Sequence, residues 1–390
     1  MTEAGSDGWS VDARKATVTV VLAAVLGAGA LALLGQVAHW DELLKAVRRG
    51  DKAWFPVCAG AQLLRYGGYV VGYRELARAR RGPELRYWTV VRLVALGFGA
   101  SVLGSAPGTL ALDFWALERA GEDVHQAARR VLALNTLEWG VLGAFAAIAA
   151  GAKLAGIGDR APLAITLAWA TALPVSLAGA AWISSGSRGE RLERPPAHAQ
   201  PRLWGKVRSA FADAIGAVVF LRYLVEHPRR YALGLLAFPL YWLGDMLTLY
   251  AALRAFGVSI GPAALVLGYT TTYVLTALPL PAGGSGGVEA ALAGTLHLVG
   301  APFAPALLAA FVYRIFVFWL PLVPALATLP AVKELRDELP RVGRGSPGGD
   351  RGVVTPTTRP SAATSSARAA ANGADHGRDD RDRSEQTAGP

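Results

Sequence analysis

The sequence predicts an all-α polytopic membrane protein, and three observations lead to this. Hydrophobic residues make up 53% of the 390-residue chain and charged residues only 17%, below the roughly 25% typical of soluble domains. Between clusters of charge lie apolar runs of about 18 residues or more, long enough to cross ~30 Å of hydrocarbon. Arginines gather in the segments between these runs, as they do in the cytoplasmic loops of polytopic proteins.

Eight runs are expected to cross the membrane as helices. The first follows Arg14 and Lys15 but exceeds the usual length of a signal peptide and has no clear cleavage site, so we expect it to be retained. The eight runs are residues 16–38, 53–73, 87–104, 131–152, 161–184, 231–254, 261–280 and 303–330.

The chain divides into three parts by composition. Residues 1–15 form a short N-terminal segment, 16–332 the transmembrane domain, and 333–390 a polar tail that is expected to be disordered because it has almost no large apolar residues. Two basic amphipathic segments, 40–52 and 203–226, are expected at the membrane interface, and the second is alternatively a helix packed on the bundle.

Two shorter apolar segments, 106–120 and 283–300, begin with glycine and proline and either span or are re-entrant. Both carry a carboxylate within an Ala/Leu-rich stretch, Asp113 or Glu289, and end at a glycine, Gly121 or Gly300. Such broken helices at matching positions are typical of an internal repeat in transporters. If both segments cross the membrane, the arginine-rich loops and both termini lie on the cytoplasmic side, and the repeat is inverted. If both are re-entrant, the basic loop 186–230 lies on the outer side of the membrane, where such a positive charge is unfavourable. The positive-inside rule therefore favours an inverted repeat.

Ionisable side chains inside apolar segments are costly and usually serve a function. Arg65 and Arg92 lie close enough to span ends to reach the interface. Asp245 and Arg314 are too central for that, so the alternative for them is a purely structural ion pair. The full set of candidates is Arg65, Arg92, Asp113, Glu138, Asp245, Glu289 and Arg314.

The stretch PLPAGGSGGVEAAL, residues 279–292, is unlike the interior of a helix. Glycines before a helix expose backbone N–H groups, which together with the helix dipole can hold an anion such as a phosphate. Glu289 would shape this site or cap the helix, and the two roles are compatible. The stretch therefore predicts a site for a phospholipid or polyprenyl-phosphate head group, formed by Gly283, Gly284, Gly286, Gly287 and Glu289.

Several other classes are excluded. The net charge of +10 resides in interhelical loops, which does not favour a nucleic-acid partner. No histidine pair has ligand spacing, and no nucleotide-binding glycine loop is present, so neither a metal nor a cofactor is expected. The single cysteine, Cys58, excludes an intramolecular disulfide.

The run from Gly283 to Leu292, preceded by Pro279 and Pro281 and followed by a span that carries Arg314, resembles the P-G-G-x-G-x-x-E-A-A motif of the lysylphosphatidylglycerol synthase transmembrane family, also called flippase-like domain proteins. The order of elements agrees over roughly residues 16–332. The resemblance implies a membrane protein that moves or holds a lipid. Because only a polar tail follows residue 332, we do not expect the soluble aminoacyl-transferase domain found in bifunctional relatives.

The sequence thus favours a non-enzymatic translocator of an anionic phospholipid or lipid-linked sugar, multi-pass in the plasma membrane. One alternative is a non-catalytic scaffold or regulator of cell-envelope synthesis, which would bind partners through its basic loops. Another is a membrane-embedded transferase that acts on a lipid carrier.

Overall fold

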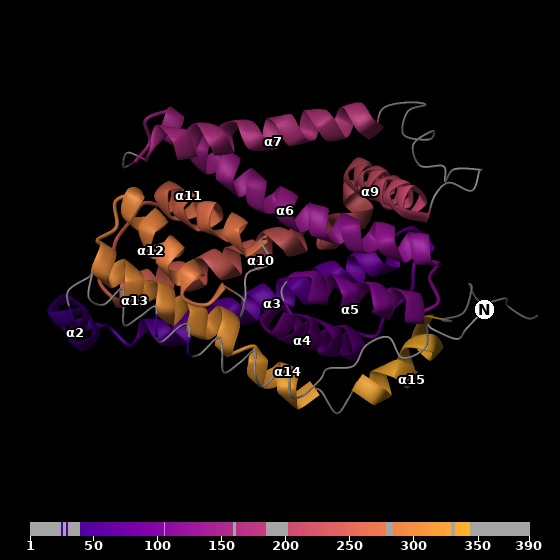
Figure 1. The fold of residues 1–390 in the computed structure, drawn as a ribbon, viewed down its shortest axis with the longest axis horizontal. Coiled ribbons are helices and arrows are strands. Elements are labelled where there is room, and N and C mark those ends of the chain that lie inside the picture. The colour runs from indigo at the N-terminus through magenta and orange to yellow at the C-terminus, as the bar shows by residue number, and fades with distance from the viewer. Residues whose placement is uncertain are drawn as a thin grey trace, which may run out of the picture. The chain divides into compact units, whose positions relative to one another are not determined.

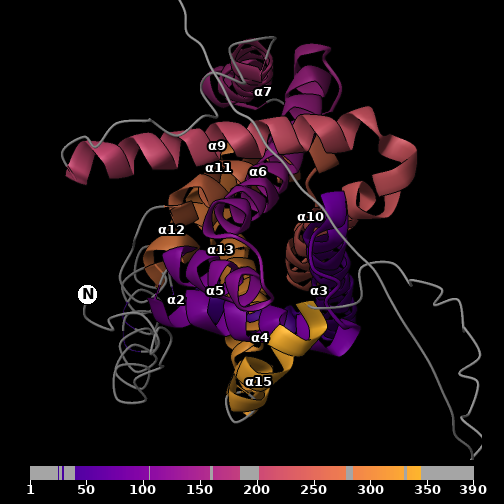
Figure 2. The same ribbon diagram turned by 90° about the vertical axis from the view of Figure 1, so that its right-hand side faces the viewer.

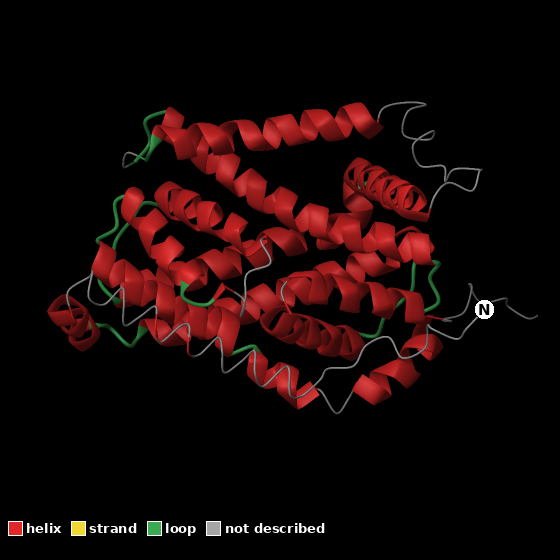
Figure 3. Ribbon diagram, in the orientation of Figure 1, coloured by secondary structure: helices red, strands yellow, loops and turns green. Residues whose placement is uncertain are grey.

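The computed structural model describes residues 40–104, 106–158, 161–184, 202–277, 284–328 and 332–343, together with positions 25 and 29. All regular structure in these ranges is helical (Figure 3). The α-helices are α2 (Trp40–Arg49), α3 (Trp54–Arg78), α4 (Tyr87–Gly104), α5 (Ala106–Arg119), α6 (Val124–Leu154), α7 (Leu163–Ser184), α9 (Arg202–Glu226), α10 (Pro228–Ala255), α11 (Pro262–Tyr273), α12 (Gly287–Leu298), α13 (Phe303–Arg314), α14 (Leu322–Thr328) and α15 (Val332–Gly343).

Four of the described helical segments are long and apolar enough to cross a membrane: α6, α7, α10 and Phe303–Ala325, which begins with α13. The predicted multi-pass architecture is therefore confirmed in outline. The count of eight spans stays a prediction, because the first span lies almost wholly outside the described residues. The span expected at 261–280 begins as the 12-residue helix α11 and tightens into the 3₁₀ turn η2 (Val274–Ala277).

The two segments interpreted as short or re-entrant form the short helices α5 and α12. They contain 14 and 12 residues, so each is only about 20 Å long at 1.5 Å per residue. Each packs against the helix before it in the chain, α5 on α4 and α12 on α11 (Figure 1).

Helices α3 and α10 run antiparallel and lie side by side (Figure 2). Glycines permit their backbones to approach closely. A Cβ on Gly68 would lie 2.7 Å from the carbonyl oxygen of Ala237, and one on Gly244 would lie 2.6 Å from that of Ala61. Small residues at such crossings are a common means of packing helices in membranes, where apolar burial gives little drive for association.

These contacts are related by an approximate two-fold pattern. Tyr241 follows Arg65 by 176 residues, and the same offset relates Gly244 to Gly68 and Ala237 to Ala61. Thus Gly68 meets Ala237 and Tyr241 on α10, while Gly244 meets Ala61 and Arg65 on α3. The two helices contribute equivalent surfaces to their shared crossing.

Helix α9, the second basic amphipathic segment, packs on α6 (Figure 2). Asp213 of α9 is buried and pairs with Arg129 of α6, Nε to Oδ1 3.4 Å. This segment is therefore a helix packed on the bundle, which was the second of the two possibilities for it.

Helix α15 differs from the sequence interpretation, which assigned residues 333–343 to the polar tail. Here they form an amphipathic helix that buries Leu335 and Leu339. Its acidic face meets Arg92 of α4, whose Nη1 lies 3.7 Å from carboxylate oxygens of Glu334 and Glu338. The few apolar residues of this segment are enough to pack a helix against the bundle, because they recur at helical spacing on one face.

The α3–α10 crossing yields a stability prediction. Gly68→Ala should lower the free energy of unfolding by about 1–3 kcal/mol, because its methyl group would press on the backbone of α10. Gly67→Ala is the matched control, since a Cβ there meets nothing within 4 Å. Thermal unfolding of the two variants in the same detergent measures the difference; equal melting temperatures would contradict the close crossing.

Candidate functional site

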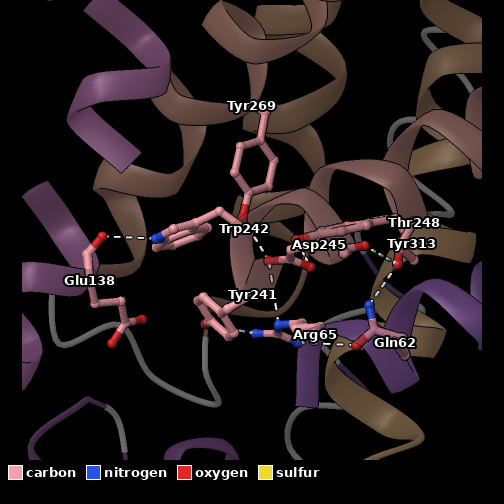
Figure 4. A network of polar contacts seen from close by, with 10 residues as sticks. Gln62, Arg65, Glu138, Tyr241, Trp242, Asp245, Thr248, Tyr269 and Tyr313 are labelled. Carbon is pink, nitrogen blue, oxygen red and sulfur yellow. Dashed lines mark hydrogen bonds and ion pairs between the residues drawn. The ribbon is translucent and has the colours of Figure 1, made fainter. Parts of the chain in front are cut away.

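The first half of the site is a buried ion pair at the α3–α10 crossing. Arg65 of α3 and Asp245 of α10 have side chains only 4% and 0% exposed, and Arg65 Nε lies 3.7 Å from Asp245 Oδ2. Asp245 also accepts hydrogen bonds from two tyrosine hydroxyls, Tyr269 of α11 at 2.6 Å and Tyr313 of α13 at 3.2 Å. A buried carboxylate needs such donors as well as an opposite charge, and Figure 4 shows them converging on Asp245.

Arg65 is held from several directions. Its Nη1 donates to Gln62 Oε1 and its Nη2 to the hydroxyl of Tyr241, each at 3.2 Å. The guanidinium carbon lies 5.0 Å from the ring centroid of Phe98 and 5.1 Å from that of Tyr241, within the range of cation–π attraction. Arg65 does not reach the interface, so that expectation is wrong; the closeness of α3 to α10 encloses it.

The second half of the site is the glycine turn before α12. Gly284 and Gly286 have φ of 72° and 87°, which favours glycine at both positions. Glu289 is 3% exposed, and its Oε2 accepts a hydrogen bond of 2.7 Å from the backbone N–H of Gly286. Its other oxygen, Oε1, accepts one of 3.0 Å from Nε of Arg314 on α13.

The carboxylate of Glu289 therefore occupies a place that the sequence interpretation gave to a bound anion. It satisfies a backbone N–H at the start of α12 and neutralises a guanidinium, as a phosphate oxygen would. The capping role and the site role of this glutamate coincide. Gly287 is exposed beside this turn, and Gly283 lies outside the described residues.

Helix α13 connects the two ion pairs. Tyr313 binds Asp245, and the next residue, Arg314, binds Glu289. Directly after Arg314 the chain passes into a π-helical turn, η4 (Ile315–Trp319). Such irregular turns are frequent at functional sites, because they change the direction of side chains within a helix.

Asp113 of α5 and Glu138 of α6 are buried and have no ion-pair partner within 4 Å among the described residues, although Glu138 interacts with Arg65 and with the hydroxyl of Tyr241. They lie close enough to each other to interact electrostatically. The indole Nε1 of Trp242 donates to the backbone carbonyl of Glu138 at 2.8 Å, which ties α6 to α10 (Figure 4). The structure thus places the predicted residues in two linked ion pairs and one pair of carboxylates.

Sequence reasoning missed the tyrosines that complete the first ion pair: Tyr241, Tyr269 and Tyr313. A signal existed, because a hydroxyl in the middle of an apolar span must find a partner. The sequence could not show which carboxylate this would be, since the partners come from helices far apart in the chain.

Buried charges within apolar helices, arranged around short helices, define a class: multi-pass membrane proteins with a polar site inside the bundle. The family model described as lysylphosphatidylglycerol synthase TM region matches residues 20–325. The chain therefore belongs to this family, as the glycine and glutamate motif indicated. No curated protein matches the chain.

The Arg65–Asp245 pair can be tested by stability. Arg65→Gln should lower the free energy of unfolding by roughly 3–5 kcal/mol, because it leaves a buried carboxylate uncompensated. Adding Asp245→Asn should recover part of this loss. Arg222→Gln, which breaks an ion pair whose two side chains are 51% exposed, should cost at most about 1 kcal/mol. Chemical unfolding of the four proteins measures these differences, and a loss in Arg65→Gln no larger than in Arg222→Gln would refute the role of the pair.

Proposed function

We propose that the protein translocates an anionic lipid, a phospholipid or a lipid-linked sugar, across the plasma membrane without chemical change. Membership of the family supports a role connected with lipids. The observation that carries the proposal is the Glu289 carboxylate, held by the N–H of Gly286 and by Arg314 inside an apolar bundle. In the proposal, Glu289 is the displaceable occupant of an anion site formed by the Gly286 N–H and Arg314.

In this mechanism a lipid phosphate exchanges with the carboxylate of Glu289. When the head group enters, its oxygens take over the hydrogen bonds from the Gly286 N–H and from Arg314, and Glu289 turns away. When the head group leaves on the other side, the carboxylate returns. The exchange keeps Arg314 paired at each stage, which avoids the cost of an isolated buried charge.

Alternating access would come from the predicted inverted repeat. The residues at the crossing support it, because the offset of 176 residues pairs identical residues, Gly68 with Gly244 and Ala61 with Ala237, as an inverted repeat would at its centre. Rocking of the halves about this crossing would open the site to either face. Tyr313 and Arg314, adjacent on α13, would couple the two ion pairs during the motion.

The basic loops place both termini in the cytoplasm under this proposal. The protein then needs no cofactor, and its partners are the membrane and the lipid.

The proposal predicts that Glu289→Gln reduces lipid movement by roughly tenfold or more, equivalent to about 1.4 kcal/mol, because a neutral amide cannot displace the head group from Arg314 and the lipid is then released slowly. The assay uses purified protein in liposomes with head-group-labelled phosphatidylglycerol, lysyl-phosphatidylglycerol and a polyprenyl-phosphate sugar. Glu226→Gln, at an exposed position on α9, is the matched control and should move lipid at the wild-type rate.

Failure takes a definite form in this assay. If folded wild-type protein moves none of the three lipids, the translocator is excluded in favour of a scaffold for envelope synthesis. If a labelled lipid is chemically altered in the assay, the protein is a transferase and not a translocator. Equal rates for wild type and Glu289→Gln would remove the glycine turn from the mechanism.

A further inference from the structure

The charges of the described bundle do not balance. All buried charged side chains other than Asp113 and Glu138 have an ion-pair partner within 4 Å in the described part of the chain. The pairs are Arg65 with Asp245, Arg314 with Glu289, Arg130 with Glu122, Glu75 with Arg78, and Asp213 with Arg129. Asp113 and Glu138 therefore stand as two carboxylates without a cation of their own.

Asp113 also has an oxygen with nothing to bind. It is 4% exposed, and its Oδ2 has no hydrogen-bond partner among the described residues. The hydroxyl of Tyr73 on α3, only 2% exposed, also lacks a hydrogen-bond partner in this part of the structure, and it interacts electrostatically with Asp113. An unpaired carboxylate in such surroundings is too costly to remain ionised without a compensating cation.

The other charged groups around α5 do not supply this cation. On α4, Arg92 turns to α15, where it meets Glu334 and Glu338. Near the end of α5, Glu122 lies close to Tyr73 and is paired with Arg130. Arg119, at the end of α5, donates from Nε to the backbone carbonyl of Arg336 on α15 at 3.3 Å. These groups are already engaged.

The groups that face Asp113 from α3 and α6 are neutral or acidic. Tyr69 and Tyr73 of α3 carry no positive charge, and Glu138 of α6 adds a negative one. Arg65 acts on Glu138, but it is bound to Asp245. The surroundings of Asp113 thus favour binding of a small cation.

We propose that Asp113, beside Glu138, binds one proton inside the bundle and is the site through which a proton gradient drives the protein. A proton fits better than a metal ion, because the described residues contain no group of three His, Cys, Asp or Glu side chains that could hold a metal. Proton uptake places O–H on Asp113 in place of an uncompensated charge, and deprotonation restores repulsion with Glu138. Proton binding stands by itself, whereas its coupling to lipid movement rests on the proposed function.

Infrared difference spectroscopy tests proton binding without any transport. Purified protein in lipid nanodiscs is stepped from mildly acidic to mildly alkaline buffer, and the protonated-carboxyl band is followed. The wild type should lose this band on the alkaline step. Asp113→Asn should lose the part of the titrating band that Asp113 contributes, leaving at most that of Glu138, and Asp41→Asn, at an exposed position on α2, should retain the whole band.

A second variant keeps the test decisive if Asp113→Asn folds poorly. Glu138→Gln should move the loss of the band to lower pH, because removal of the neighbouring negative charge weakens proton binding by Asp113. A wild-type spectrum with no titrating carboxyl, or a band unchanged in Asp113→Asn, would overturn the proposal. Loss of the band on adding sodium at constant pH would also overturn it, in favour of an alkali-cation site.

Coupling is tested in the liposome assay with a pH gradient across the membrane. Lipid movement should follow the gradient in the wild type and become independent of it in Asp113→Asn. If the rate of lipid movement by the wild type does not depend on the pH gradient, the proposed coupling is wrong. A titrating band in a protein that moves no lipid upholds the proton site while the proposed function fails.

Discussion

Compensation of charge inside apolar helices is the constraint on which the rest of the site depends. A carboxylate or guanidinium removed from water costs several kcal/mol unless an opposite charge and hydrogen-bond donors meet it. Asp245 receives Arg65 and two tyrosine hydroxyls, and Glu289 receives Arg314 and a backbone N–H. One ion pair therefore joins α3 to α10 and the other joins α12 to α13, and the hydrogen bond from Tyr313 to Asp245 links the two.

Close packing and charge placement act together at the α3–α10 crossing. The glycines at 68 and 244 let the backbones approach until Arg65 and Asp245 lie within reach of each other. A wider crossing would leave both charges unpaired, and the same residues would then be costly. The approximate two-fold pattern of contacts shows that both helices contribute in the same way, with Gly68 and Gly244 as equivalent points.

The glycine turn before α12 illustrates how one residue serves structure and site at once. Positive φ angles at Gly284 and Gly286 turn the backbone so that the N–H of Gly286 points at Glu289. The carboxylate caps the helix and neutralises Arg314, and it thereby occupies an anion site within its own chain. Under the proposed function, this internal anion would exchange with a lipid head group.

The sequence by itself determined the membrane class, the short helices α5 and α12, and the family, because apolar run length and the glycine and glutamate motif are local features. It also marked Asp245, Glu289 and Arg314, since a charge in the middle of an apolar run is visible without a structure. Only the tertiary structure decided the pairing of Arg65 with Asp245, the tyrosine donors, and the burial of Arg65. These contacts join helices distant in the chain, and no local pattern encodes which faces meet.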